Sequence, residues 1–348
     1  MSISPVKAPG RIASSRSSGR TTLATVAARA GVSTMTASRA LNHPELVSDL
    51  VRERVRAAAA ALAYVPNRAA RSLASARSGV ILVLVPSLSN AVFAPLLDGL
   101  EEALEPANYQ LLIGNTRYSD AHEEKLFAAH LQSNPDGVLF CGLQRSASMA
   151  AMLDAARLPS VAMMDLSDQP GQLSVGFSQV DAGYALTRHL IDSGRKRIAF
   201  AGAQLDERTL RRADGYRKAV REAGLHDPRL ELMLPAPSSV AFGADMLDRI
   251  LADTPDCDAI FFCNDDLAQG AVFRCQRRAI DVPGQLAICG FNDIAPSAWM
   301  QPSLTTVATP RYQIGFEAGM LLRQLIDGKT PATTRIDLGF TLMLRESA

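Results

Sequence analysis

The chain has little of what enzymes and metalloproteins need. Its 348 residues include five cysteines, an odd number without Cys-x-x-Cys or zinc-type spacing, so we interpret them as reduced core residues and expect no metal site. The five histidines are scattered, and no Gly-x-Gly-x-x-Gly turn, Walker loop or Gly-x-Ser-x-Gly elbow occurs. The sequence therefore predicts a protein that is not an enzyme, with no catalytic residues and no cofactor.

Long apolar segments are missing as well. No apolar core follows the early Lys7, so a signal peptide is not expected, and the longest apolar run, residues 79–86, has only the length of a strand. We expect a cytoplasmic, nucleoid-associated protein without membrane contact. Residues 1–20 are rich in Ser, Gly, Pro and basic residues, which predicts a disordered basic tail.

The chain as a whole also lacks a large net charge, whereas its separate regions are strongly charged. Residues 1–78 contain 12 Lys and Arg against 3 Asp and Glu, a formal charge of +9, whereas residues 79–348 contain 24 against 32, a charge of −8. A basic head on an acidic body is typical of a protein that contacts nucleic acid.

Residues 21–66 have the pattern of three short helices, the first two joined by a tight turn. Thr22 is a suitable N-cap for the first helix, Gly31 suits the left-handed turn after it, and Ser33 caps the second. Small side chains form one face of the second helix, while Thr34, Met35, Ser38 and Arg39 face outward, as a DNA major groove requires. A third helix is expected from Ser48 to Tyr64. The alternative is a small solvated bundle with surface arginines.

From residue 79 onward, apolar strands alternate with amphipathic helices over about 270 residues. This alternation predicts two doubly wound lobes with parallel sheets and helices on both faces. Ligands of such sheets bind beyond the carboxyl ends of the strands, here between the lobes. Polar side chains follow several expected strands, Asn90, Asp165, Arg208, Arg212, Asn264, Asp265 and Asn292 among them. The acid and amide residues that start helices are equally well explained as N-caps, and Arg211 and Arg212 as surface residues of a helix.

Residues 21–78 resemble the DNA-binding headpiece of the LacI/GalR family of bacterial transcription regulators. The resemblance rests on Gly31-Val32-Ser33, Thr36-Ala37-Ser38-Arg39, Asn42 and Tyr64-Val65-Pro66-Asn67-Arg68, in the family's order. It implies a helix-turn-helix domain at 21–66 that reads pseudo-palindromic, double-stranded operator DNA. The residues that it implies in DNA binding are Thr22, Leu23, Ser33, Thr34, Met35, Thr36, Ser38, Arg39, Asn42, Asn67 and Leu73.

The same resemblance implies a hinge helix and linker at 67–78. Pro66 favours an end to the preceding helix, and an alanine-rich segment of about ten residues is too short to be a stable helix alone. Leu73 corresponds to the leucine that the family inserts between base pairs from the minor groove. The alternative is an ordinary linker leucine that packs on the body.

The body has the family's landmarks too, among them Pro135-Asp136-Gly137, Asn264-Asp265-Asp266 and Gly290-Phe291-Asn292. They imply a periplasmic-binding-protein-like core at 79–348, with a first lobe of about 79–178 and 307–325 and a second of about 179–306 and 326–348. The family's effector contacts carry over to Phe93, Asp165, Asn264, Asp265 and Asn292, and the strand-end position adds Asn90, Arg208 and Arg212 to the expected effector residues. Most relatives have an aspartate where this chain has Asn292, which removes a negative charge and favours an anionic effector.

Within the family, the segment Leu205–Arg212 and its three arginines resemble the gluconate-utilisation repressors. Arginine binds carboxylate or phosphate with a bidentate fork, so we expect gluconate or another sugar acid such as a ketogluconate or 6-phosphogluconate. The alternatives are a family member that responds to a neutral sugar or other metabolite, and a sugar-binding protein without a DNA function. A two-fold operator predicts a homodimer, with the core as interface.

The wedge role of Leu73 is directly testable. Substitution Leu73→Ala removes the side chain that would be inserted between neighbouring base pairs, so operator affinity should fall by about tenfold or more. Electrophoretic mobility shifts at fixed salt would measure it. An unchanged affinity would support the linker alternative.

Overall fold

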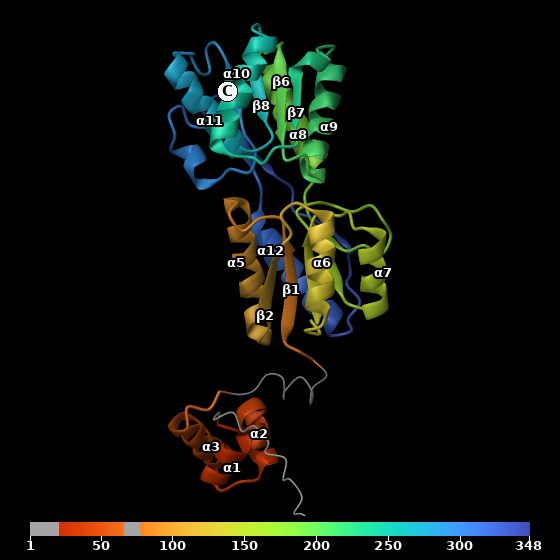
Figure 1. Cartoon of the computed structure of the whole chain (residues 1–348), viewed down its shortest axis with the longest axis vertical. Coiled ribbons are helices and arrows are strands. Elements are labelled where there is room, and N and C mark those ends of the chain that lie inside the picture. The colour runs from red at the N-terminus through yellow and green to blue at the C-terminus, as the bar shows by residue number, and fades with distance from the viewer. Residues whose placement is uncertain (1–20, 66–76) are drawn as a thin grey trace, which may run out of the picture. The chain divides into compact units, whose positions relative to one another are not determined.

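The computed structural model describes residues 21–65 and 77–348, which belong to two compact units divided at Ser75 and Ala76. The basic tail at 1–20 and most of the expected hinge segment, including Asn67 and Leu73, lie outside the described residues. Figure 1 shows the helices of the first unit and the two larger, parallel sheets of the second. None of the helices in the described ranges is long and apolar enough to cross a membrane.

The first unit, called the head below, consists of α1 (Leu23–Ala30), α2 (Thr34–Asn42) and α3 (Asp49–Ala61), with a 3-10 turn at Pro44–Leu46. The expected caps are confirmed: the Thr22 side chain accepts a hydrogen bond from the Thr25 amide, and Ser33 accepts one from the Thr36 amide. Gly31 has φ 66°, the left-handed conformation expected after α1. The α3 helix ends before the expected Tyr64, because the chain turns at Ala63 with φ 45°.

Small side chains fill the core of the head. Its fully buried apolar residues are Val26, Ala27, Ala30, Ala37, Ala40, Val55, Ala58 and Ala59. Alanines on three helices allow the backbones to approach closely, so the short helices pack without large side chains. The apolar spacing in the sequence predicted this inner face.

The first lobe of the second unit is built on a six-stranded parallel sheet of order β11-β5-β4-β3-β1-β2. Its strands are β1 (Val80–Val85), β2 (Gln110–Asn115), β3 (Gly137–Cys141), β4 (Ser160–Met163), β5 (Ser174–Gly176) and β11 (Arg335–Asp337). Successive β1 side chains join different apolar clusters: Ile81 and Val83 pack with Leu96 of α5, and Leu82 and Leu84 with helix residues such as Phe127. This two-sided burial explains the continuous apolar run in the sequence.

Four helices cover this sheet: α5 (Ala94–Leu104), α6 (Asp120–Leu131), α7 (Ala147–Ala156) and α12 (Arg311–Ile326). The short helical turns Ala91–Phe93 (η2) and Glu105–Ala107 flank α5. Helices α5 and α12 lie side by side at very short range, because a Cβ on Gly99 would come within 2.1 Å of the Tyr312 carbonyl oxygen. Residues 91–107 thus form three consecutive helical elements rather than one continuous α-helix.

The second lobe has a four-stranded parallel sheet of order β7-β6-β8-β9. Its strands are β6 (Ile198–Ala203), β7 (Glu231–Leu234), β8 (Ala259–Phe262) and β9 (Ala287–Cys289), and a 3-10 turn at Pro228–Leu230 precedes β7. Helix α8 (Gln179–Asp192) packs on α9 (Glu207–Glu222), and α10 (Val240–Asp253) packs on α11 (Asp265–Arg278). The two pairs flank opposite sides of the sheet (Figure 1). A helical head, followed in the chain by two doubly wound lobes with parallel sheets, confirms the predicted fold class.

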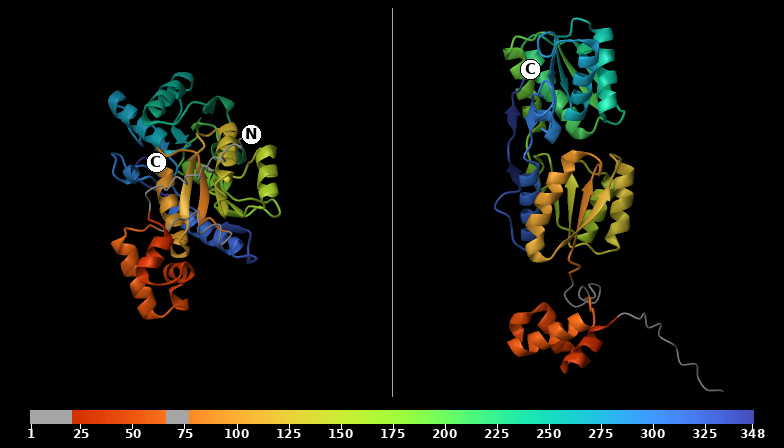
Figure 2. Two further views of the ribbon diagram at one scale, coloured as in Figure 1. Left: turned by 60° about the horizontal axis from the view of Figure 1, so that its bottom comes forward. Right: turned by 90° about the vertical axis from the view of Figure 1, so that its left-hand side faces the viewer.

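The chain passes between the lobes three times. After β9, a 3-10 turn at Ala295–Ala298 leads to β10 (Thr306–Ala308), which pairs antiparallel with β12 (Thr341–Met343). We expected residues 326–348 in the second lobe, whereas β11 pairs with β5 of the first lobe's sheet. The chain then returns, and the Ser347 carbonyl accepts the Ile288 amide of β9, near the C-terminal mark of Figure 2.

Helix pairs that meet at glycine predict a sharp penalty for an added methyl group. A Cβ on Gly270 of α11 would lie 1.8 Å from the Val240 carbonyl oxygen of α10. Gly270→Ala should therefore lower the free energy of unfolding by about 1–3 kcal/mol, although alanine favours a helix. Urea unfolding followed by circular dichroism measures this. Arg277→Ala, at an exposed position of the same helix, should change it by less than about 0.5 kcal/mol.

Candidate functional site

The outward face of α2 holds the side chains predicted to read DNA. Thr34, Met35 and Arg39 are exposed, and 66% of the Met35 surface is accessible. Ala37 and Ala40 point the other way, into the core of the head. This short helix thus presents a hydroxyl, a thioether and a guanidinium on one face, a combination that fits base edges and thymine methyl groups in a major groove.

Other predicted DNA contacts are also used within the head. The Ser33 and Thr36 hydroxyls lie 2.9 Å apart at the start of α2, and the Asn42 amide donates to the Ser38 carbonyl at 3.0 Å. Leu23 is half-buried against the head's apolar core. These contacts fix both ends of α2, so the reading helix is rigid before any DNA is met.

The arginines of the head divide into two kinds. Arg54 donates to the Ala30 carbonyl at the end of α1, so its charge stabilises a helix C-terminus. Arg29 and Arg39 are exposed and form no ion pair with any described residue. The latter two remain free to contact DNA, and of these arginines the sequence had singled out Arg39 alone for that role.

A polar pocket lies between the two lobes of the second unit, at loops that follow the strands. Six of the eight predicted effector residues line it: Asn90, Phe93, Arg208, Arg212, Asn264 and Asn292. Its remaining lining residues are Val92, Tyr118, Met164, Gln204, Asp206, Thr209 and Ser238. The strand-end argument thus located the pocket on both lobes.

One cation of the pocket is neutralised by a carboxylate. Arg208 donates through Nε and Nη2 to Asp206 Oδ2, and its guanidinium lies 5.6 Å from the centre of the Phe93 ring. Burial alone would raise the pKa of Asp206, but the nearby Arg208 charge and the Thr209 amide outweigh it and lower that pKa to about 2. Both groups are therefore ionised at neutral pH, and their charges cancel.

The second cation, Arg212, has no such partner. Its Nε donates to Gln179 Oε1 at 2.8 Å and its Nη1 to the Cys263 carbonyl at 2.6 Å, while the guanidinium lies 3.8 Å from the centre of the Phe291 ring. Among the described residues, no carboxylate oxygen lies within 4.0 Å of it, and Nη2 makes no hydrogen bond. Burial lowers the pKa of Arg212 to about 10, so the group still carries a full positive charge at neutral pH.

Amide side chains supply most of the neutral polar lining. Asn90 caps η2 by accepting from the Val92 amide, and its Nδ2 lies 3.4 Å from the Tyr118 hydroxyl. Asn264 caps α11 and bonds to Ser238. Asn292 adopts φ 109°, and its buried Oδ1 has no hydrogen-bond partner among the described residues. The lining therefore offers both donors and acceptors, as a polyhydroxylated ligand requires.

Two predicted effector residues lie outside the pocket lining. Asp265 accepts hydrogen bonds from the Ile294 amide (2.8 Å), the Ser297 hydroxyl (3.1 Å) and the Thr306 hydroxyl (2.6 Å). It therefore joins the loop after β9 to the crossing strand β10. The N-cap alternative was also wrong for Asp265, because Asn264 caps α11 and Asp265 is the first residue of the helix.

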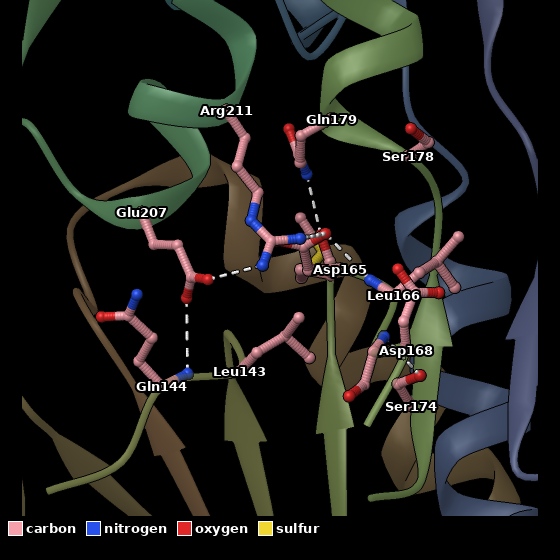
Figure 3. A network of polar contacts seen from close by, with 12 residues as sticks. Leu143, Gln144, Asp165, Leu166, Asp168, Ser174, Ser178, Gln179, Glu207 and Arg211 are labelled. Atoms are coloured by element: carbon pink, nitrogen blue, oxygen red, sulfur yellow. Dashed lines mark hydrogen bonds and ion pairs between the residues drawn. The ribbon is translucent and has the colours of Figure 1, made fainter. Parts of the chain in front are cut away.

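Asp165 is the other displaced residue, and Figure 3 shows its surroundings. Its side chain is 1% exposed, and Oδ1 accepts the Leu166 amide at 2.9 Å and Arg211 Nη1 at 3.2 Å. Arg211 belongs to α9 of the second lobe, so this ion pair crosses between the lobes. The preceding residue, Met164, lines the pocket instead.

Sequence reasoning missed Tyr118 and Ser238. Ser238 follows β7, so the strand-end rule would have found it had it been applied to every strand. Tyr118 follows β2, in a turn where Arg117 and Tyr118 both have φ 54°. No residue type in that turn indicates a left-handed pair, so the sequence held no signal for it.

A helix-turn-helix head and a two-lobed, periplasmic-binding-protein-like body define a class of DNA-binding transcriptional regulators. Residues 22–67 match the family of bacterial regulatory proteins, lacI family, and residues 187–348 match the periplasmic binding protein-like domain. The chain belongs to the LacI family and is a DNA-binding transcriptional regulator rather than an enzyme.

Three relatives support this assignment. The HTH-type transcriptional regulator GntR of Pseudomonas aeruginosa is 47% identical over 95% of this chain and 97% of its own length. The crystal structure of transcription regulator GntR from Chromobacterium violaceum is 56% identical, covering 77% of this chain and 98% of that one, with a TM-score of 0.76. The Lac repressor dimer bound to operator and the anti-inducer ONPF is 25% identical over 94% of this chain and 99% of that one, with a TM-score of 0.84.

Asp265 predicts an unusual dependence of stability on pH. Burial raises its pKa to about 6, although the hydrogen bonds that it accepts lower the pKa in part. The folded protein therefore binds this proton more tightly than the unfolded chain does. The contribution of Asp265 to the free energy of unfolding is fully present below about pH 4 and is lost as pH rises through 6.

The comparison with Asp265→Asn, which cannot titrate, isolates this contribution. Between pH 7 and pH 4, wild type should gain up to about 3 kcal/mol relative to the variant in urea unfolding. A difference that does not vary with pH would show that Asp265 has an ordinary pKa.

Proposed function

We propose that this regulator represses genes of sugar-acid utilisation and that gluconate, or a close sugar acid such as a ketogluconate or 6-phosphogluconate, controls its operator binding from the inter-lobe pocket. The observation that carries the proposal is Arg212, a buried cation that forms no ion pair with a carboxylate of the described residues and whose Nη2 donates no hydrogen bond to them. A ligand carboxylate would supply the missing charge and acceptor.

The rest of the lining supports a polyol attached to that carboxylate. Asn90, Tyr118, Ser238 and Asn264 provide amides and hydroxyls that both donate and accept, which is what each sugar hydroxyl needs. Asn292, whose buried Oδ1 has no hydrogen-bond partner among the described residues, adds an acceptor without adding a negative charge. The ion pair of Asp206 and Arg208 keeps the remaining pocket charges balanced.

Control of DNA binding would be a coupling between two sites. If operator DNA favours one orientation of the lobes and the sugar acid another, each ligand weakens the binding of the other by the same factor. Couplings of about 1–3 kcal/mol change operator affinity roughly 5- to 150-fold. This mechanism requires no chemical step.

We further propose that the regulator acts in the cytoplasm as a homodimer on a pseudo-palindromic operator, with the body as interface. Two aromatic side chains of the second lobe support this: Trp299 is 87% exposed and Phe273 of α11 is 46% exposed. Gln276, one turn after Phe273, donates to the Gln301 carbonyl, so α11 and the Trp299 loop form one surface. A second copy would cover it, as apolar surface of this kind favours.

Operator binding with and without effector tests the proposal. Gluconate, 2-ketogluconate or 6-phosphogluconate should shift operator affinity at least fivefold, measured by fluorescence anisotropy at constant salt. D-glucose and D-glucitol, which lack the carboxylate, serve as matched neutral controls and should have no effect. A response to a neutral sugar but to none of the three acids would refute the role given to Arg212.

A further inference from the structure

Helix α9 of the second lobe touches loops of the first lobe at two points. Arg211 Nη1 lies 3.2 Å from Asp165 Oδ1, after β4, and Glu207 accepts the Gln144 amide, after β3, at 3.3 Å. Arg211 Nη2 also donates to Glu207 Oε1 at 2.7 Å, within the same helix. Figure 3 shows the three charged side chains as one connected group. The lobes are thus joined beside the pocket by charged contacts.

The same group is connected to the free cation of the pocket. Gln179 accepts from Arg212 through Oε1 and donates through Nε2 to the Met164 carbonyl at 2.8 Å, next to Asp165. A chain of hydrogen bonds therefore runs from Arg212 through Gln179 to the segment that Arg211 binds. A displacement of Asp165 would therefore be transmitted to Arg212 through these hydrogen bonds.

Asp165 is poorly compensated apart from Arg211. It is 1% exposed, and its Oδ2 has no hydrogen-bond partner among the described residues. Burial raises its pKa to about 6, while the Leu166 amide and the charges of Arg211 and Arg208 act in the opposite direction. The charge of Arg212 is favoured by Asp206 and, to a smaller extent, by Asp165. Without Arg211, the pocket arginines would be the remaining cations to attract this carboxylate.

We propose that Arg211 is a positioning residue that determines effector selectivity: by pairing with Asp165 across the lobes, it keeps this carboxylate from cancelling the charge of Arg212. The inference rests on the proposed sugar-acid function and deepens it. An anionic effector binds because Asp165 is already paired with Arg211 and leaves the charge of Arg212 available. A neutral polyol of the same length does not depend on Arg211 in this way.

The substitution Arg211→Gln tests the inference, with gluconate and D-glucitol as probes in isothermal titration calorimetry. At pH 8, where Asp165 is ionised, gluconate affinity should fall at least tenfold, and any D-glucitol affinity should change less than twofold. The double variant Asp165→Asn/Arg211→Gln should recover gluconate affinity to within about threefold of wild type, because the competing charge is gone. Arg217→Gln is the matched control, since Arg217 lies on the same helix and pairs with Glu231 of its own lobe.

Recovery in the double variant separates positioning from a merely structural role. The inference is overturned if Arg211→Gln behaves like Arg217→Gln, or if Asp165→Asn fails to restore gluconate binding. If wild type binds no gluconate, the proposed function fails instead. In that case, thermal unfolding of the ligand-free protein tests the pairing of Asp165 with Arg211. The Tm shifts of the two single substitutions should not add up to the shift of the double variant, and additive shifts would refute the pairing.

Discussion

The parallel direction of the strands in both lobes is the constraint on which the pocket depends. Every strand of a parallel sheet ends at the same edge, so the loops that follow the strands collect there. Asn90 follows β1, Met164 follows β4, Asn264 follows β8 and Asn292 follows β9. Three passages of the chain connect the lobes, and the strand ends of both sheets lie at the same pocket. The polar side chains meet there although they come from distant regions of the sequence.

Three side chains that line this pocket also cap helices. Asn90, Asp206 and Asn264 each accept a backbone amide at the start of a helix, and each also lines the pocket. The capping bond fixes the side chain, so a ligand meets groups that are already oriented, which reduces the entropy cost of binding. These three residues are both helix caps and pocket-lining residues, so the cap alternative does not exclude a place in the pocket.

The sequence predicted the elements that depend on local patterns. Helix spacing, Gly31 and the caps Thr22 and Ser33 defined the head, and apolar strands located most of the pocket edge. Strand-end position does not fix the direction of a side chain, however. Asp265 turns toward Thr306 and Asp165 toward Arg211 because partners remote in sequence hold them there. Strand β11 was missed because its three residues are exposed or half-buried and lack an apolar run.

The alanine-rich core of the head has a consequence for how the protein fails. Side chains as small as Ala30, Ala37 and Ala58 remove little apolar surface from water, and a small unit already buries a modest fraction of its chain. The body, with its phenylalanine-rich sheets, removes much more apolar surface from water. On warming, the head should therefore unfold while the body is still folded, so the regulator would lose DNA binding before it loses the pocket.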